Sequence, residues 1–213
     1  MKLLIVRPQP AADETAARAR ALGLEPVVAP LFATRPLDWT PPNPAGFDAI
    51  LLTSANAARL GGDGLLPLLA LPCYAVGERT AEAARAAGFA DVRTGPSDGA
   101  ALAAMAERDG ARSMLHLGGR DHAAIGNAVH IAVYASEPTG ALPADPGGMV
   151  VLLHSTRAAS RFAGLAPDRE TIVIAAISAQ AAAAAGGGWK EVAIAAAPRD
   201  EALLELAAKL CQT

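Results

Sequence analysis

The feature that most constrains the fold of this chain is an internal repeat with a period of about 100 residues. Residues 51–58 and 152–159 both read Leu-Leu-Thr/His-Ser-x-x-Ala-Ala. Three further matches keep the same order and nearly the same spacing: 31–36 with 133–138, 88–92 with 188–192, and 96–98 with 198–200. Biased composition alone would not hold the spacing constant, so we interpret the chain as a duplicated unit that is too long for a solenoid repeat.

Each repeat alternates short apolar segments with amphipathic ones, which is typical of parallel sheets covered by helices on both faces. Hydrophobic residues make up 52% of the chain but aromatic residues only 4%, because alanine, a strong helix former, supplies much of the apolar content. We predict strands at 3–6, 49–52, 74–76, 113–117, 129–134, 149–153, 172–177 and 192–195. We predict helices at 12–22, 80–87, 98–108, 156–163, 180–185 and 200–210. The pattern predicts an α/β protein of two similar domains with parallel sheets, of the flavodoxin or Rossmann type.

Glycine, proline and aspartate mark the predicted boundaries. Gly23 and Gly88 follow helices where a left-handed residue is favoured, and Asp98 and Asp200 follow prolines where a side-chain oxygen can cap a helix. Two extended segments, 26–36 and 128–138, end in proline and are predicted to connect the domains. The stretches richest in proline and glycine, 40–44 and 138–148, place the boundaries near them. If the chain leaves one domain at the first connector and returns to it at the second, both termini lie in the same domain.

Composition excludes several classes of protein. The net charge of −3 without a basic tract argues against a nucleic-acid partner. No apolar run is long enough to cross a membrane, and the start of the chain turns polar after six residues, unlike a signal peptide, so we expect a cytoplasmic protein. Cys73 and Cys211 lack the spacing of a disulfide framework or a thiolate metal site. The chain has four histidines, none at zinc-site spacing: His116, His122, His130 and His154.

Ligands of parallel sheets bind at the carboxyl ends of the strands, where helix N-termini offer free N–H groups. The residues directly after the predicted strands carry mainly hydroxyls and arginines: Arg7, Thr53, Ser54, Asn56, 77–80, Arg120, His154, Ser155, Thr156 and 178–180. A serine there can cap a helix, bind a ligand, or do both. Because the repeat places Ser54 and Ser155 at equivalent positions, we expect two facing sites that hold one ligand.

Other kinds of site found at such turns are disfavoured by the spacing of the residues. Neither a GxGxxG motif after a strand nor a GxxxxGK(S/T) motif is present, which argues against dinucleotides and nucleoside triphosphates. Ser155 lacks the GxSxG flanks of a hydrolase nucleophile. Arg7 and Arg120 can bind a carboxylate or form salt bridges. Tyr134, whose repeat partner is Phe32, either packs between the domains or donates a proton or hydrogen bond.

In this order and spacing, six segments resemble the uroporphyrinogen-III synthase family over nearly the whole chain: LLIVRP, ILLTSANA, YAVGERTAEAARAAGF, IAVYASEP, VVLLHSTRAASRF, and IAAISAQAAAAA followed by GW. The resemblance implies two α/β domains, one from 1–36 plus 137–213 and one from 38–133, joined by connectors near 29–38 and 131–138. It also implies an active site in the cleft between them. The implied reaction is the closure of linear hydroxymethylbilane with inversion of its terminal pyrrole ring and loss of water.

The resemblance also implies roles for individual residues. Tyr134 matches a cleft tyrosine that assists loss of the substrate's hydroxyl, Ser54 and Ser155 match binding serines, and Thr80 matches a cleft threonine. At 177–181 many relatives have a glycine and two threonines, so only Ser178 and Gln180 carry over there. The full set expected to bind substrate is Arg7, Thr53, Ser54, Asn56, Thr80, Arg120, Ser155, Thr156, Ser178 and Gln180. We expect a monomer that needs no cofactor or metal.

Two other interpretations fit a duplicated α/β architecture. A two-lobed small-molecule-binding or sensor protein without catalysis has the same layout. A transferase of nucleotide-sugar type would also have two α/β domains, although the missing phosphate loop disfavours it.

Overall fold

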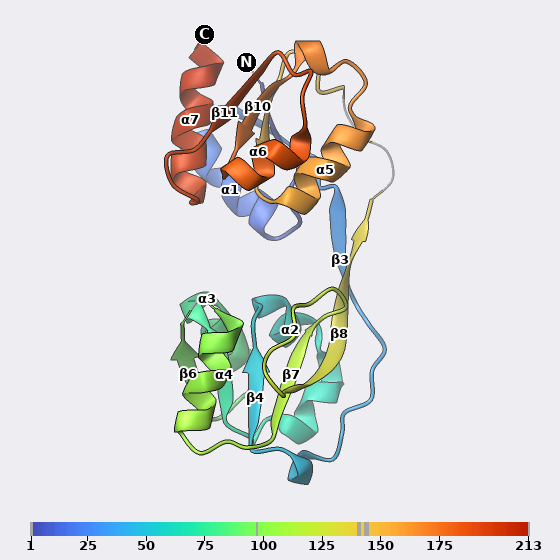
Figure 1. The fold of residues 1–213 in the computed structure, drawn as a ribbon, viewed down its shortest axis with the longest axis vertical. Helices are drawn as coiled ribbons and strands as arrows, with labels where there is room; N and C mark the ends of the chain where they lie inside the picture. The colour runs from blue at the N-terminus through green and yellow to red at the C-terminus, as the bar shows by residue number, and fades with distance from the viewer. Residues whose placement is uncertain (1, 97, 140–141, 143–144, 213) are drawn as a thin grey trace. The chain divides into compact units, whose positions relative to one another are not determined.

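The computed structural model describes residues 2–96, 98–139, 142 and 145–212 (Figure 1). The chain divides into two compact units. Unit 1 contains Met1–Ala33 and Glu137–Thr213, and unit 2 contains Thr34–Ser136. Residues 97, 140, 141, 143 and 144, which belong to the repeat match at 96–98 and to the predicted boundary at 138–148, lie outside the described part of the chain.

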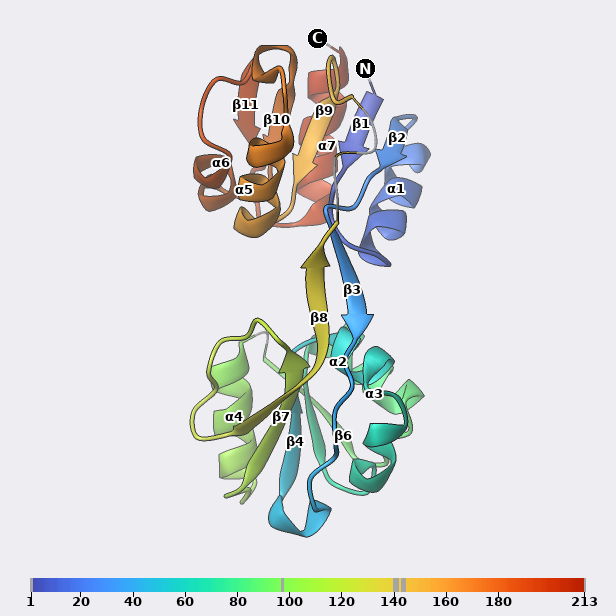
Figure 2. The same ribbon diagram turned by 90° about the vertical axis from the view of Figure 1, so that its right-hand side faces the viewer.

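Unit 1 is a parallel sheet with helices on both faces (Figure 2). Its strand order is β11-β10-β9-β1-β2, with β1 Lys2–Ile5, β2 Glu25–Val28, β9 Val150–Leu153, β10 Val173–Ala176 and β11 Glu191–Ile194. Its helices are α1 Ala11–Ala21, α5 Thr156–Leu165, α6 Ala179–Ala185 and α7 Asp200–Gln212, with a 3-10 turn at Arg169–Thr171. Alternate residues of β1 face opposite cores: Leu3 and Ile5 pack with α1 and α7, and Leu4 packs with α5 and α6.

Unit 2 is built in a similar way around a mainly parallel sheet of order β3-β8-β7-β4-β5-β6, in which β3 runs opposite to β8 (Figure 2). Its strands are β3 Phe32–Pro36, β4 Ala49–Leu52, β5 Cys73–Val76, β6 Val92–Gly95, β7 Met114–Gly119 and β8 Val129–Pro138. Its helices are α2 Ala55–Leu60, α3 Gly77–Ala86 and α4 Gly99–Arg108, with 3-10 turns at Pro44–Gly46 and Gly62–Leu68. Ile50 and Leu52 pack against α2 and α3, while Ala49 and Leu51 pack against α4.

The internal repeat explains why the two sheets match. Taken in the order of unit 1, the strands β11, β10, β9, β1 and β2 correspond to β6, β5, β4, β7 and β8 of unit 2. Each repeat is therefore divided between the units: the first supplies β1 and β2 to one sheet and β4 to β6 to the other. One helix has no counterpart. Where α1 follows β1, the segment 120–128 follows β7 as a loop, and Ile125 packs into the core under α4.

The structure confirms the predicted α/β class with parallel sheets, and it adds elements that the pattern did not predict. These are β2, β3, β6 and α2. The segments 26–36 and 128–138, predicted as connectors only, contain strands, because β3 and β8 pair in sheet order and Leu37 donates its N–H to the carbonyl of Val133. The left-handed glycines are as predicted, with φ of 76° at Gly23 and 101° at Gly88.

Asp98 caps α4 as predicted, since its carboxylate accepts the N–H of Ala100 at 2.8 Å. The equivalent prediction for Asp200 is wrong. Asp200 is the first residue inside α7, and its carboxylate accepts hydrogen bonds from Thr15 and His154. Thr15 of α1 and His154, which follows β9, thus occupy the carboxylate oxygens of Asp200. These oxygens are not used to cap α7.

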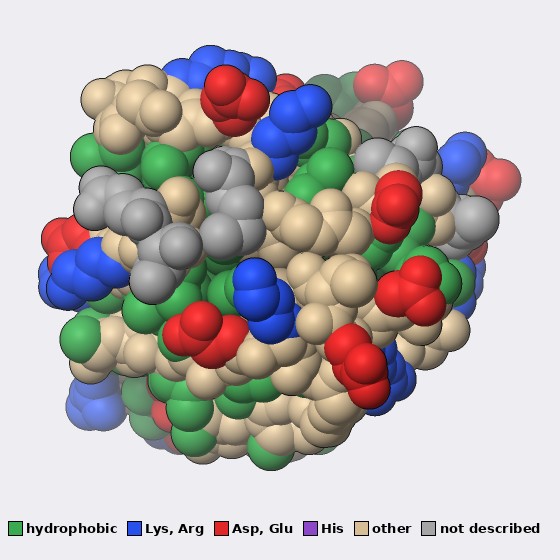
Figure 3. All heavy atoms as spheres, turned by 90° about the horizontal axis from the view of Figure 1, so that it is seen from above, with side chains coloured by type: hydrophobic (Ala, Val, Ile, Leu, Met, Phe, Trp, Pro, Cys, Tyr) green, Lys and Arg blue, Asp and Glu red, His purple; other side chains and the backbone are tan. Residues whose placement is uncertain are grey.

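Among the described residues, no helix is long and apolar enough to span a bilayer. The face drawn in Figure 3 carries acidic and basic side chains interspersed with apolar and small ones.

Candidate active site

A pocket of about 380 Å³ opens in unit 2 at the carboxyl end of β4 and β7. Three parts of the fold meet there: the turn between β4 and α2, the first turn of α4, and the loop between β7 and β8. Tyr134 of β8 completes the lining. The lining residues are Thr53, Ser54, Asp98, Gly99, Ala100, His116, Gly119, Asp121, His122, Ala123, Ala124, Ile125 and Tyr134.

The hydroxyls of this pocket come from the turn that ends β4. Ser54 is the N-cap of α2, and its Oγ accepts the N–H of Asn56 at 3.2 Å. Capping occupies a lone pair of the oxygen and leaves the O–H of Ser54 as a donor. Thr53, directly before it, is half-buried, with its Oγ1 3.0 Å from Nε2 of His116. The cap and the buried contact therefore hold two neighbouring hydroxyl groups in place at the pocket.

Tyr134 reaches the pocket because of an irregularity in β8. The register between β7 and β8 pairs Gly118 with Ala132 and Gly119 with Tyr134, so Val133 is an extra residue of the bulge. Such a bulge redirects the side chains that follow it. Val133 is fully buried, and Tyr134 lies against Gly119, while its carbonyl accepts the N–H of Arg120 at 2.9 Å.

Three histidines lie together beside Thr53. His116 of β7 and His130 of β8 are register partners, and their Nδ1 atoms are 3.1 Å apart. The ring of His122 stacks on that of His130, with the ring centroids 3.3 Å apart. Burial, followed by the charges of His130 and His122, lowers the pKa of His116 to about 4. Burial and the charge of His122 also lower the pKa of His130. Both rings are therefore neutral at pH 7.

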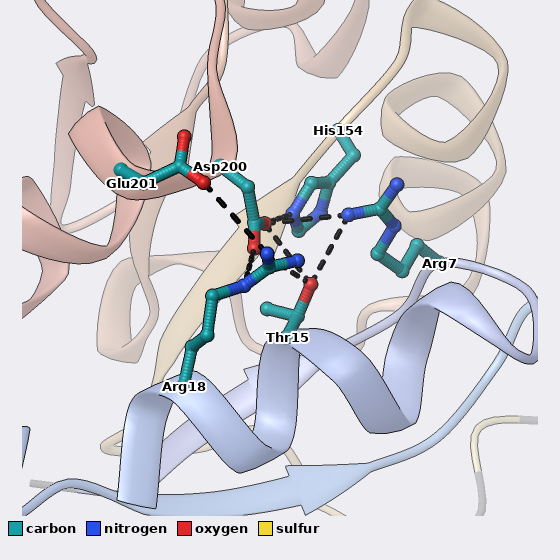
Figure 4. Close-up of polar contacts among 6 residues, drawn as sticks. All are labelled: Arg7, Thr15, Arg18, His154, Asp200 and Glu201. Atoms are coloured by element: carbon teal, nitrogen blue, oxygen red, sulfur yellow. Dashed lines mark hydrogen bonds and ion pairs between the residues drawn. The ribbon is translucent and has the colours of Figure 1, made fainter. Parts of the chain in front are cut away.

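The equivalent corner of unit 1 is filled by a hydrogen-bonded ion cluster (Figure 4). Oδ1 of Asp200 accepts hydrogen bonds from His154 Nε2 at 2.8 Å and Thr15 Oγ1 at 3.0 Å, and Arg7 lies 3.3 Å from the same oxygen. Arg18 pairs with Oδ2 at 3.0 Å. Thr15 and Arg18 belong to α1, the helix that unit 2 lacks. Unit 2 has a loop where unit 1 has α1, so the equivalent corner of unit 2 is not filled. The pocket lies in that corner.

The protonation of this cluster follows from its geometry. Burial lowers the pKa of His154 more than the hydrogen bond to Asp200 raises it. Burial alone would raise the pKa of Asp200, but hydrogen bonds from His154 and Thr15 outweigh it and the pKa is lowered. His154 is thus neutral and donates through Nε2, while Asp200 is ionised. The carboxylate of Asp200 balances the positive charge of Arg7.

The structure brings Thr53, Ser54 and Tyr134 together in one pocket, and it places the other residues predicted to bind substrate elsewhere. Thr80 is buried inside α3, Asn56 lies in the first turn of α2, and Arg120 is exposed after β7. In unit 1, Ser155 and Ser178 cap α5 and α6 through hydrogen bonds from the N–H groups of Ala158 and Ala181. Thr156 and Gln180 are exposed in the first turns of those helices.

Sequence reasoning missed the part played by His116, His130, Asp98 and Asp121 around this pocket. The signal for the histidines was present, since both lie within consecutive predicted strands that pair in parallel. Within the described residues, no group of three or more His, Cys, Asp or Glu side chains is placed to hold a metal ion.

Comparisons with known proteins identify the family. The family model described as uroporphyrinogen-III synthase HemD matches residues 13–126, which is more than half of the chain. A crystal structure of uroporphyrinogen-III synthetase from Helicobacter pylori is 19% identical, with a TM-score of 0.70 over 98% of this chain and 99% of that one. A mutant uroporphyrinogen III synthase from Thermus thermophilus is 16% identical, with a TM-score of 0.51 over 100% and 99%.

At these identities the two solved structures establish the fold, and the family assignment depends on the sequence model. A search of curated protein sequences gives no match. The match to the family model, the matching fold and the hydroxyl-lined pocket agree, and the chain belongs to the uroporphyrinogen-III synthase family.

Proposed function

We propose that this chain carries out the reaction of its family, a cyclising lyase step of tetrapyrrole biosynthesis, in the pocket of unit 2. Hydroxymethylbilane loses its terminal hydroxyl as water, the last ring is inverted, and the chain closes to uroporphyrinogen III. The observation that carries the proposal is the grouping of Tyr134, Thr53 and Ser54 in one pocket of a chain that belongs to this family. Family membership favours this reaction over a non-catalytic sensor.

Loss of the hydroxyl is the step that the pocket suits best. The pyrrole nitrogen expels the hydroxyl group, which takes up a proton and leaves as water, and an azafulvenium cation remains; the site must therefore donate to the departing oxygen and tolerate a cation. Tyr134, Thr53 and Ser54 supply hydroxyl donors. Asp98 and Asp121 place acidic groups at the rim, and the described residues that line the pocket include neither lysine nor arginine. The low pKa of His116, about 4, keeps a further cation away from the developing charge.

The size of the pocket assigns it to one end of the substrate. About 380 Å³ accommodates only part of a linear tetrapyrrole, and we place the hydroxymethyl end there. Asp98 and Asp121 would repel carboxylates, so the carboxylates of the other three rings bind outside this pocket and those of the terminal ring point away from the two acidic side chains. Ser155, Thr156, Ser178 and Gln180, at the helix N-termini of unit 1, and Arg7, Asn56, Thr80 and Arg120 remain proposed contacts for other parts of the substrate.

Positioning then decides the product. An azafulvene left to itself closes directly to the symmetric type I isomer, whereas attack through the substituted carbon of the last ring gives a spiro intermediate and the type III isomer. The protein must hold the last ring so that only the second attack is in reach. We further propose that the enzyme works in the cytoplasm, as a monomer, without a cofactor.

The test is a product analysis. The purified chain is incubated with freshly prepared hydroxymethylbilane, the products are oxidised, and the type I and type III isomers are separated. Type III in excess over a protein-free control supports the proposal. Type I alone, at the rate of the protein-free control, would overturn it. Gel filtration with light scattering tests the proposed monomer.

A further inference from the structure

We propose that His116, supported by His130, is a positioning residue that turns the hydroxyl hydrogen of Thr53 toward the pocket. The proposal rests on the function proposed above and deepens it, because it gives Thr53 a defined role as hydrogen-bond donor to the departing hydroxyl of the substrate. His116 itself acts through Thr53 and is not assigned a contact with the reacting atoms.

The contacts form a short series that runs from the partly buried His130 through the buried His116 to Thr53 at the pocket. Nδ1 of His130 lies 3.1 Å from Nδ1 of His116, and Nε2 of His116 lies 3.0 Å from Oγ1 of Thr53. His116 is 2% exposed, so solvent has little access to its ring in competition with these partners. Each contact in the series needs one hydrogen atom, and a neutral histidine carries only one.

Only two hydrogen arrangements satisfy both contacts with neutral rings. In the first, His130 donates to His116, and His116 donates to Thr53, whose own hydrogen is then available to the pocket. In the second, every donor is reversed: Thr53 donates to His116, and His116 donates to His130, so Thr53 offers the pocket only lone pairs. The tautomer of His116 therefore determines whether Thr53 is a donor or an acceptor toward the substrate.

The surroundings of His130, at the other end of this series of hydrogen bonds, favour the first arrangement. Nε2 of His130 is buried and makes no hydrogen bond of good geometry among the described residues, although the backbone of Gly119 and of His116 lies near the ring. In the second arrangement this atom would carry a buried, unpaired N–H, whereas in the first it is an unpaired acceptor. Among buried backbone groups, an N–H without a partner is rarer than an under-satisfied carbonyl, and we apply the same preference to the imidazole nitrogen. His130 thus keeps its hydrogen on Nδ1, and Thr53 keeps its own hydrogen for the pocket.

The backbone leaves room for this pair of rings. A Cβ atom at Gly118 would lie 2.9 Å from Nε2 of His116 and 3.0 Å from Cε1 of His130. The first contact is shorter than real Cβ atoms make and the second is tighter than most, so a side chain at residue 118 would have to displace the rings. Burial, together with the charges of neighbouring histidines, lowers the pKa of both rings and keeps them neutral, as the two-arrangement argument requires.

The first experiment is a double-mutant cycle on the rate of type III formation. Thr53→Val is expected to lower kcat about tenfold, the effect of one lost hydrogen bond in the transition state. His116→Asn, whose amide is too short to reach Thr53, is expected to have a similar effect. His116→Gln places an amide near the Nε2 position and is expected to retain most of kcat. The double variant Thr53→Val/His116→Asn should be no slower than either single variant.

The control is Tyr74→Phe in the same unit. The hydroxyl of Tyr74 donates to Asp109 at 2.9 Å, away from the pocket, so this variant loses a buried hydrogen bond of unit 2 without touching Thr53. It is expected to lower stability and leave kcat unchanged. Losses in kcat that multiply in the double variant, equal losses for His116→Asn and His116→Gln, or an unaffected Thr53→Val enzyme would each overturn the proposal.

The second experiment needs no activity. Nitrogen-15 spectra of the imidazole rings should show the hydrogen on Nε2 of His116 and on Nδ1 of His130. The opposite pattern would overturn the assigned direction even if the enzyme makes type III product. Conversely, absence of type III product with the expected tautomers would contradict the proposed function and leave the hydrogen arrangement standing.

Discussion

The ring of Tyr134 lies against the backbone of Gly119, where a Cβ atom would come within 3.0 Å of ring atoms Cε2 and Cζ. The bulge that includes Val133 brings the ring to this position, and the absence of a side chain at residue 119 allows it to stay there. The placement of the phenol in the pocket is therefore determined by two backbone features of neighbouring strands.

Tyr134→Phe is expected to keep the fold and lower kcat for type III product at least about tenfold, because the phenol hydroxyl is proposed to assist departure of the substrate's hydroxyl. The chain has one other tyrosine, so Tyr74→Phe makes the same chemical change away from the pocket. Rates of type III formation and circular dichroism measure the two effects. Unchanged turnover in Tyr134→Phe would assign the residue to packing.

Gly119→Ala is expected to reduce turnover by displacing the Tyr134 ring, while all atoms of the phenol remain present. The new methyl group has to push the ring by a few tenths of an ångström, and small displacements of catalytic groups are costly in rate. The matched control is Gly164→Ala in α5, where a Cβ meets nothing within 4 Å. That variant should gain about 0.5–1 kcal/mol of stability with unchanged turnover. Equal turnover in both variants would contradict the placement of Tyr134.

Asp200→Asn is expected to lower the free energy of unfolding of unit 1 by about 2–4 kcal/mol, because it removes the carboxylate that compensates Arg7 and Arg18 in a partly buried cluster. Its neighbour Glu201 is a matched control: it is exposed and lies 3.7 Å from Arg18. Glu201→Gln should cost less than about 1 kcal/mol. Denaturant unfolding measures both. A loss no larger for Asp200→Asn than for the control would show that the cluster adds little stability.

Stability should fall as the pH is lowered below about 6.5, the ordinary pKa of histidine. Burial lowers the pKa of His154, and burial also lowers that of His116, to about 4, so the unfolded chain takes up protons first. The contribution of these two neutral histidines to the free energy of unfolding is fully present above pH 6.5. It is lost as the pH falls toward their pKa values in the folded protein. The lowered pKa of Asp200 acts in the same direction below its ordinary value.

Unfolding titrations of the parent chain and of His154→Gln, across pH 7 to about 4, check this sign. The variant should show a weaker dependence on pH in the upper part of that range, because it lacks one of the imidazoles whose pKa is lowered by burial. A free energy of unfolding that rises on acidification in the parent chain would contradict the assigned protonation states.

The elements predicted well from sequence are those buried on both sides. The strand predicted at 49–52 matches β4, whose four residues are all buried. The strand β6, with sequence VRTG, has little apolar signal and was missed, as was β2, which contains a proline and lies at the edge of its sheet. The helix α2 has only six residues, too few for a clear period.

The candidate site was predictable in part for a similar reason. Thr53 and Ser54 follow a clear strand, so the rule that ligands bind at carboxyl ends identifies them. The role of His116 depends on β7 being paired with β4 on one side and β8 on the other, which sequence order does not reveal. The repeat also predicted similar halves, but the open corner of unit 2 follows from the loss of a single helix that no local pattern announces.

The division of each repeat between the two units has a consequence for synthesis of the chain. Unit 2 is continuous, so all strands that pair within it have left the ribosome once residue 138 is clear. In unit 1, β1 lies between β2 and β9, and β9 is made only after the whole of unit 2. The first strand, which is apolar, is therefore paired on one side only until β9 has been made. We expect unit 2 to fold during translation and the N-terminal segment to be the part most in need of protection from aggregation.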